Sequence, residues 1–171
     1  SAWEFRHKHR LTENGFEDLP FIGDALADCF KLFGHRHIES TGNEEFRNDD
    51  VRVWSPDGEV LVASITCKMH LIGPAVGEGL LKALEIAEAR YQGLVVWSPD
   101  EPFSAGANLE AMMPIFMKAG AKGIAAEEKK LQDAMLRVRY AAVPTVAAIR
   151  GLALGGGCEL AVHCAKRVAH M

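Results

Sequence analysis

A strand, a helix and a second strand follow one another in the middle of the chain, and this pattern limits the fold more than any other feature. Glu59–Thr66 predicts a strand, and the apolar residues between Val76 and Tyr91 recur at helical spacing. Gly93 is a stop signal for that helix, and Leu94–Trp97 predicts a fully buried strand. If the two strands are parallel neighbours in one sheet, the helix makes a right-handed crossover. The pattern therefore predicts an α/β fold.

The other predicted elements continue this α/β order. A Pro-Asp-Gly turn favours a hairpin just before the crossover, and a glycine-rich turn separates the last strand from the last helix. Outside the crossover we predict a strand at Val51–Trp54, a helical stretch from Leu109 that Pro114 interrupts, an amphipathic helix over 125–140, a buried strand at Thr145–Ile149, and a helix that begins near Gly157.

Residues 1–50 differ from the rest of the chain. They contain charge clusters and one convincing helix, Phe21–Phe33, whose apolar residues recur at helical spacing. The mostly polar stretch Glu39–Asp50 predicts a linker. We therefore interpret residues 1–50 as an N-terminal arm or the tail of a preceding domain, and residues 51–171 as a separate unit.

The composition excludes several classes of protein. The 171 residues are 49% apolar and 25% charged, which suits one domain with a hydrophobic core and excludes a disordered or collagen-like chain. The net charge of −4 has the wrong sign for a nucleic-acid binder, and no polybasic stretch favours a membrane surface. The longest run without Asp, Glu, Lys or Arg, Tyr140–Ile149, is far shorter than the ~20 residues of a spanning helix. We therefore expect a soluble, cytoplasmic protein with no nucleic-acid or membrane partner.

Cysteine and histidine give no strong signal of a disulfide or metal site. The histidine pairs in His7-Lys8-His9 and His35-Arg36-His37 have no third ligand in a recognisable motif, so we expect solvated basic surface and no metal. No C-x-x-C pair occurs, and the apolar surroundings of the cysteines predict buried thiols in a reducing cytoplasm. The four cysteines are Cys29, Cys67, Cys158 and Cys164.

Two loops, each beyond a predicted strand, are candidates for the chemistry. The small residues of Phe103–Glu110 allow a ligand to approach the backbone, and free N–H groups of the helix that follows would point into the site. A plain strand-to-helix turn is the alternative for this loop.

The second loop, Gly151–Leu160, contains three consecutive glycines at a helix start, which cost roughly 1 kcal/mol each relative to alanine in regular structure. A backbone amide that meets a developing oxyanion would justify this cost, and Glu159 in the first turn would face the same ligand. The alternative is that Glu159 stabilises the helix N-terminus and the glycines permit close packing. The run matches neither nucleotide-binding glycine motif, because it lacks the Lys-Ser/Thr of one and the spacing of the other.

Taken together, FSAGANL at Phe103–Leu109 and PTVAAIRGLALGGGCEL at Pro144–Leu160 resemble the two signature segments of the crotonase, or enoyl-CoA hydratase/isomerase, family. The resemblance covers residues 51–171 and implies a crotonase-like spiral of ββα units, incomplete at its C-terminus. The leading segment does not match, which suggests a multifunctional fatty-acid oxidation protein in which a 3-hydroxyacyl-CoA dehydrogenase part precedes the hydratase. The resemblance implies no cofactor in this chain, and NAD would belong to the dehydrogenase part.

The resemblance also implies roles for individual residues. The N–H groups of Ala107 and Gly156 would form an oxyanion hole for the thioester oxygen of an acyl-CoA, and Glu159 would activate water as general base or acid. Asn108 stands where the family most often has Asp. Lys68 would meet a CoA phosphate, with a solvated lysine as the alternative. Substrate contacts are expected from Ala105, Gly106, Ala107, Asn108, Leu109, Gly156 and Lys68, and an acyl pocket or simply core from Met112, Met113, Ile115, Phe116 and Met117.

The implied activity is hydration of 2-enoyl-CoA thioesters in fatty-acid β-oxidation. The alternatives are an enoyl-CoA isomerase, a CoA thioester hydrolase, or a non-catalytic acyl-CoA-binding or assembly module. The second glutamate of hydratases would lie beyond Met171, so we expect this fragment alone to be a poor or inactive catalyst. An open sheet edge and an exposed apolar face would favour homo-oligomers.

Overall fold

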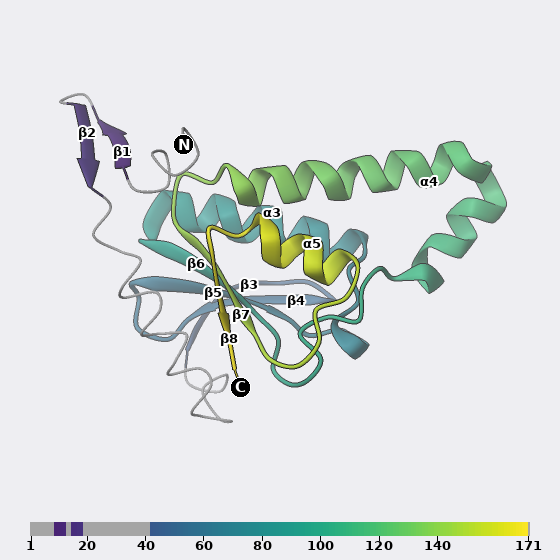
Figure 1. The fold of residues 1–171 in the computed structure, drawn as a ribbon, viewed down its shortest axis with the longest axis horizontal. Helices are drawn as coiled ribbons and strands as arrows, with labels where there is room; N and C mark the ends of the chain where they lie inside the picture. Colours follow the sequence, from purple (N-terminus) through teal and green to yellow (C-terminus); the bar gives the residue numbers. More distant parts are fainter. Residues whose placement is uncertain (1–8, 13–14, 19–41, 171) are drawn as a thin grey trace.

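A six-stranded sheet organises the part of the chain that the structure, a computed structural model, describes: residues 9–12, 15–18 and 42–170 (Figure 1). Its strands occur in chain order across the sheet and are β3 (Asn43–Arg47), β4 (Val51–Ser55), β5 (Val60–Ile65), β6 (Gly93–Trp97), β7 (Thr145–Ile149) and β8 (Lys166–Ala169). A separate hairpin pairs β1 (His9–Thr12) with β2 (Gly15–Asp18). The helix expected at Phe21–Phe33 lies outside the described residues.

The predicted crossover is confirmed. β4 and β5 form the expected antiparallel hairpin, and α3 (Pro74–Arg90) connects β5 to its parallel neighbour β6, with Leu61 opposite Leu94. β7 and β8 continue the parallel part of the sheet. The loops that follow β5, β6 and β7 therefore all leave the sheet at the carboxyl ends of these strands.

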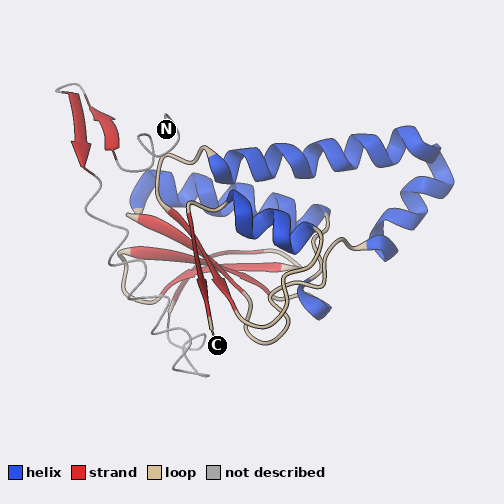
Figure 2. Cartoon of the chain, viewed as in Figure 1, coloured by secondary structure: helices blue, strands red, loops and turns tan. Residues whose placement is uncertain are grey.

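The helices α3, α4 (Leu109–Arg139) and α5 (Gly156–His163) lie over one face of the sheet (Figure 2). Residues from that face of the strands and from all three helices form one buried cluster, which includes Val53, Leu80 and Leu160. Trp54 and Trp97 belong to a second buried cluster, made by strand residues of alternate positions. The central strands β4–β7 are therefore buried on both faces, as apolar parallel strands generally are.

The polar linker expected over Glu39–Asp50 is wrong for the residues of β3. This strand pairs antiparallel with β4, and the Glu44 carboxylate accepts a hydrogen bond from Arg52 at 2.8 Å. No residue of β3 is fully buried, so its strand conformation depends on backbone pairing with β4 and not on an alternation of apolar residues. The assignment of the remaining N-terminal residues to an arm or a preceding domain stays a prediction.

α4 runs through Pro114, although the sequence predicted an interruption there. The proline removes one donor, and the carbonyl of Glu110 that would have accepted it lies on an exposed turn, where water can replace the donor. The break lies instead at Gly120, whose φ of 60° and ψ of −152° suit glycine. Within the described residues, no helix has the length and apolar character needed to cross a membrane.

Candidate functional site

The loops that follow β5, β6 and β7 meet at the carboxyl ends of these parallel strands. The Ile72 N–H, in the first loop, donates to the Gly106 carbonyl in the second at 2.7 Å. The Leu154 N–H, in the third loop, donates to the Ser104 carbonyl in the second at 2.9 Å. The two loops that the sequence singled out are thus held together at the carboxyl ends of the strands, where parallel sheets place ligand sites.

The backbone of Gly156 lies next to the Ala107 N–H. A Cβ built on Gly156 would lie 3.8 Å from the Ala107 nitrogen. Gly156 begins α5, and the first N–H groups of a helix have no acceptor within it. Ile72 forms backbone hydrogen bonds with Gly106 and Asn108, the residues on both sides of Ala107. The Ala107 N–H therefore points away from Ile72. Because neither N–H donates to a described backbone carbonyl, this pair can hold an anionic oxygen.

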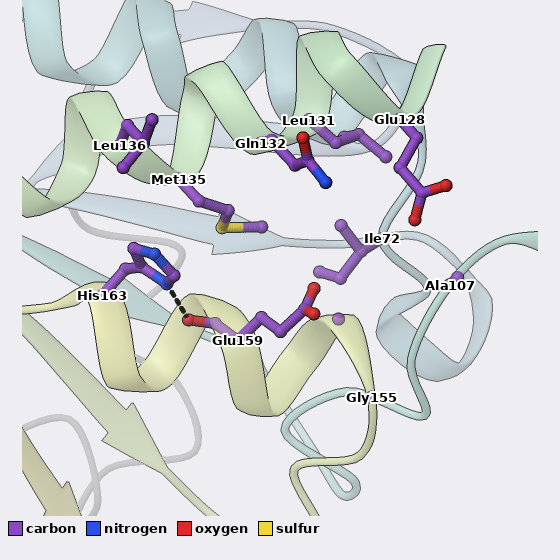
Figure 3. Close-up of a pocket in the computed structure, with 11 residues that line it drawn as sticks. Ile72, Ala107, Glu128, Leu131, Gln132, Met135, Leu136, Gly155, Glu159 and His163 are labelled. Carbon is purple, nitrogen blue, oxygen red and sulfur yellow. Dashed lines mark hydrogen bonds between the residues drawn. The ribbon is translucent and has the colours of Figure 1, made fainter. Parts of the chain in front are cut away.

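A cavity of about 480 Å³ opens beside this pair of N–H groups (Figure 3). α5 forms one wall and α4 the other, and Figure 3 shows the Glu159 carboxylate pointing into the space between them. That carboxylate has no hydrogen bond or ion pair with the described residues, so its oxygens are free to bind water or a ligand. The lining residues are Ile72, Ala107, Glu128, Leu131, Gln132, Met135, Leu136, Gly155, Gly156, Glu159 and His163.

A second cavity, of about 420 Å³, adjoins the first and is almost entirely apolar. The two share Ile72, Ala107, Glu128 and Leu131. The second cavity is also lined by Leu109, Met112, Met113, Phe116 and Ile124. Of the five residues proposed from the sequence for an acyl pocket or core, Met112, Met113 and Phe116 therefore line it, whereas Ile115 and Met117 do not.

The other residues predicted to contact substrate lie around the two cavities. Gly106 has a φ of 107°, which favours glycine, and its carbonyl is used by Ile72. The Asn108 side chain caps α4 by accepting from the Ala111 N–H at 3.0 Å. The Ala105 N–H donates to the Met69 carbonyl. None of Ala105, Gly106 and Asn108 lines either cavity, so they hold the loop that presents Ala107.

Lys68 is placed apart from both cavities. It lies in the short 3₁₀ helix η2 (Lys68–His70), its side chain is exposed, and it lines neither cavity. At the end of the same short helix, the His70 ring is buried and lies 3.2 Å from the Asp100 carboxylate. A contact of Lys68 with a CoA phosphate stays a prediction.

Glu128 is one of several residues of the first cavity that the sequence did not single out; the others include Leu131, Gln132, Met135, Leu136 and His163. Glu128 comes from the polar stretch Glu127–Lys130 on α4, far along the chain from Glu159, and no local motif distinguishes it from its charged neighbours. Only the packing of α4 opposite α5 brings the two carboxylates to one cavity (Figure 3).

An ion pair holds the end of α4 on α3. The Arg137 guanidinium donates to the Glu88 carboxylate at 2.7 Å, and the Ala142 N–H donates to its other oxygen at 2.9 Å. Partial burial raises the pKa of Glu88, but these donors outweigh it and the net pKa is lowered. The contact fixes the half of α4 that carries the cavity residues Leu131 and Met135.

The described cysteines only partly agree with the expectation of buried thiols. Cys164 is buried and Cys67 is half-buried, and burial raises the pKa of the Cys67 thiol. Cys158 is exposed, so the expectation is wrong there: it follows the glycines on the outer side of the first turn of α5. Cys29 lies outside the described residues. The described residues contain no group of three or more potential metal ligands.

Comparison with known proteins identifies the family of this chain. The sequence model of the family described as enoyl-CoA hydratase/isomerase matches residues 68–170, more than half of the chain. The "Peroxisomal bifunctional enzyme" of Cavia porcellus is 34% identical over 104 residues, which are 60% of this chain and 13% of that protein. The "Fatty acid oxidation complex subunit alpha" of Aliivibrio fischeri is 33% identical over 132 residues, 71% of this chain and 18% of that protein. The chain thus spans less than a fifth of the length of either relative.

Solved structures show the same fold. An enoyl-CoA hydratase from Bacillus anthracis superposes with a TM-score of 0.63 and 25% identity over 71% of this chain and 47% of that one. An enoyl-CoA hydratase/carnithine racemase from Magnetospirillum magneticum superposes with a TM-score of 0.65 and 24% identity, over 74% of this chain and 47% of that one. The α/β fold is therefore that of crotonase-fold enoyl-CoA hydratases. The chain belongs to the enoyl-CoA hydratase/isomerase family.

Proposed function

We propose that this chain binds acyl-CoA thioesters and takes part in the hydration of 2-enoyl-CoA in fatty-acid oxidation. The observation that carries the proposal is the neighbouring pair of free N–H groups, Ala107 and Gly156, on the same cavity as the unpaired carboxylate of Glu159. Addition of water to an α,β-unsaturated thioester needs both an oxyanion site and a group that moves the proton of water.

The chemistry assigns one role to each group. The carboxylate of Glu159 accepts a proton from water as the water oxygen bonds to C3 of the enoyl chain. The C2–C3 π electrons move toward the thioester, and negative charge develops on its oxygen beside the Ala107 and Gly156 N–H groups. The enolate then collapses as C2 takes the proton back from Glu159, so that one water molecule has been added. One such N–H donor typically contributes ~2.7–4 kcal/mol to the stability of the transition state.

The adjoining apolar cavity supports the choice of an acyl chain as ligand. An acyl chain whose thioester oxygen lies at Ala107 and Gly156 would extend past Ile72 and Leu131, which both cavities share, toward Met112 and Phe116. The flexible side chains of methionine adapt to ligands of different shape. An isomerase or a thioester hydrolase of the same family would bind its substrate in the same way, so only a turnover assay with 2-enoyl-CoA separates these activities from hydration.

The longer relatives suggest a wider setting for the proposal. Their printed names describe a bifunctional enzyme and a subunit of a fatty acid oxidation complex. We propose that this chain acts within such a system, in the cytoplasm and as a homo-oligomer. Where a dehydrogenase part accompanies it, NAD would bind that part, because this chain carries no dinucleotide-binding glycine motif.

Calorimetric titration with a saturated acyl-CoA, butyryl-CoA, tests the binding step. Gly156→Pro removes one proposed donor at the first helical position, where proline is tolerated, and Glu159→Gln removes the carboxylate charge. We expect the parent chain and Glu159→Gln to bind with similar affinity and Gly156→Pro to bind more weakly while its circular dichroism is unchanged. Absence of binding by the parent chain, or equal binding by a folded Gly156→Pro, would contradict the proposed site.

A further inference from the structure

His70 is a buried histidine that the proposed mechanism does not use. It is only 5% exposed, and burial of its two ring nitrogens is costly unless each has a hydrogen-bond partner. Nδ1 lies 2.6 Å from the Pro102 carbonyl, which can only accept a hydrogen bond, so Nδ1 carries a proton and donates it. Nε2 lies 3.2 Å from the carboxylate of Asp100, whose side chain is mostly exposed. The shorter contact, from Nδ1 to Pro102, joins the loop after β5 to the loop after β6.

The backbone at His70 has a conformation that residues other than glycine rarely adopt. Met69 has a φ of 57° and His70 a φ of 51°, so two consecutive residues lie in the left-handed region. Such a conformation persists only where the surrounding structure holds it, and it is concentrated at functional sites. Here the Met69 carbonyl accepts from the Ala105 N–H at 3.0 Å, and the His70 ring reaches Pro102. Both contacts are made to the loop that carries Ala107.

The side chain of His70 completes a row of contacts between these two loops. Further along the row, the Ile72 N–H donates to the Gly106 carbonyl at 2.7 Å, and the Ile72 carbonyl accepts from the Asn108 N–H at 2.8 Å. Ala107 lies between the two residues that Ile72 holds. The contact of His70 is made by a side chain and these others by the backbone, so a substitution at His70 can break the row at its start.

We propose that His70 is a positioning residue of the acyl-CoA site, which fixes the Ala107 N–H where it meets the thioester oxygen. The inference rests on the proposed function, because it takes the role of Ala107 from there. His70 lines neither cavity, so its effect passes through the backbone from Pro102 to Ala107. An N–H donor stabilises an oxyanion when it is already aimed at the position of that oxygen before the reaction begins. Loss of the bond from Nδ1 therefore weakens thioester binding and reduces the polarisation of the thioester carbonyl.

Three substitutions at His70 separate the lost donor from the change in shape. His70→Asn keeps an N–H donor in about the place of Nδ1, and asparagine accepts a positive φ. His70→Gly also accepts a positive φ but has no donor, and His70→Leu keeps the bulk of the ring without a donor. The matched control is Val53→Ala, which lowers the stability of the buried cluster from β4 and lines neither cavity. Circular dichroism and urea unfolding verify that each variant is folded.

Two measurements on each folded variant test the proposal. Calorimetry gives the affinity for butyryl-CoA, and infrared difference spectroscopy gives the stretching band of its thioester carbonyl, labelled with carbon-13. In the parent chain this band should move to lower frequency on binding, because donors at the oxygen weaken the C=O bond. His70→Gly and His70→Leu should bind about tenfold more weakly and show a smaller band shift at saturation. His70→Asn and Val53→Ala should match the parent chain in both measurements.

The outcomes distinguish this inference from the proposed function. Parent affinity and a parent band shift in a folded His70→Gly or His70→Leu would overturn the role of His70 and leave the proposed function standing. An equal loss in His70→Asn or in Val53→Ala would also overturn it, since the effect would then not depend on the donor. Absence of butyryl-CoA binding by the parent chain, or binding without a band shift, would overturn the proposed function and this inference with it.

Discussion

Gly157 lies in direct contact with Ser104, and this contact sets the distance between the two loops of the site. A Cβ built on Gly157 would lie 2.4 Å from the Ser104 Cβ and 2.7 Å from its Oγ. The backbone of Ser104 is itself bonded to the loop after β7, through Leu152 and Leu154. Because no Cβ separates them, the first turn of α5 can approach this loop closely enough to bring Gly156 beside the Ala107 N–H.

Gly157→Ala is therefore expected to destabilise the chain and to weaken acyl-CoA binding. The new methyl group must displace a buried residue that is held by backbone hydrogen bonds, and overpacking of this kind costs about 1–3 kcal/mol. Urea unfolding measures the loss of stability, and butyryl-CoA titration measures binding. An unchanged unfolding midpoint would show that the contact with Ser104 is not tight.

Gly156→Ala, one residue earlier, is expected to separate these two effects. Its Cβ would meet Ile72 at 3.4 Å, an ordinary contact, and its φ lies outside the left-handed region. The fold should thus remain intact, with an unfolding midpoint close to that of the parent chain. The methyl group would instead lie near the Ala107 N–H, so butyryl-CoA should bind more weakly. Normal affinity in a folded Gly156→Ala would argue against a ligand oxygen at this position.

The sequence predicted best those features that depend on local periodicity or on a contiguous motif. The strands around α3 are apolar runs, and the two loops that carry Ala107 and Gly156 are continuous segments with unusual glycine content. β3 was missed because its strand conformation depends on pairing with β4 rather than on its own polar residues. β8 was missed as well, since it is a short edge strand whose first residues are charged.

The arrangement of α4 shows why part of the site could not be predicted. The exposed position of Pro114 allows the helix to continue, and Gly120 changes its direction. Which face of the second half then meets α5 is decided by contacts between distant segments, such as Arg137 with Glu88. Glu128 reaches the cavity only through that packing, so it has no signature in the sequence around it.

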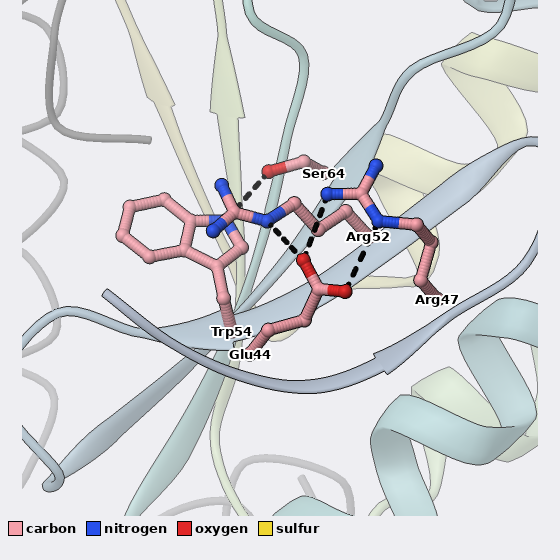
Figure 4. A network of polar contacts seen from close by, with 5 residues as sticks. All are labelled: Glu44, Arg47, Arg52, Trp54 and Ser64. Atoms are coloured by element: carbon pink, nitrogen blue, oxygen red, sulfur yellow. Dashed lines mark hydrogen bonds and ion pairs between the residues drawn. The ribbon is translucent and has the colours of Figure 1, made fainter. Parts of the chain in front are cut away.

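The Glu44 network on β3 and β4 predicts a loss of stability in acid (Figure 4). Hydrogen bonds from Arg47 and then Arg52, outweighing the effect of desolvation, lower the pKa of Glu44 from 4.5 to about 2. A carboxyl group with a lowered folded-state pKa stabilises the fold when it is ionised, so its contribution is present above about pH 4.5 and is lost as the pH falls toward 2.

Urea unfolding of the parent chain and of Glu44→Gln, followed from pH 6 down to about pH 2, measures this contribution. The difference in stability between the two should be largest at pH 6 and should shrink through the window set by Glu44. β3 and β4 are expected to stay paired in the variant, because the antiparallel backbone ladder that joins them does not involve the Glu44 side chain. A difference that stays constant across this range would mean that the ion pairs contribute nothing.

The contribution of Tyr91 to the stability of the fold has the opposite pH dependence, because it is lost in alkali. Burial, followed by the hydrogen bond that its hydroxyl donates to Glu45 at 2.5 Å, raises the pKa of Tyr91 from 10.0 to about 12. A group whose folded-state pKa is raised stabilises the fold in its protonated form, so this contribution is complete below pH 10 and is lost as the pH rises toward 12. Tyr91→Phe removes the hydroxyl and with it the pH dependence, because phenylalanine does not titrate.

The absorbance of the Tyr91 phenolate is the difference between the pH titrations of the parent chain and of Tyr91→Phe. This absorbance should develop near pH 12. Its appearance near pH 10 would show that Tyr91 is not bonded to Glu45 in solution.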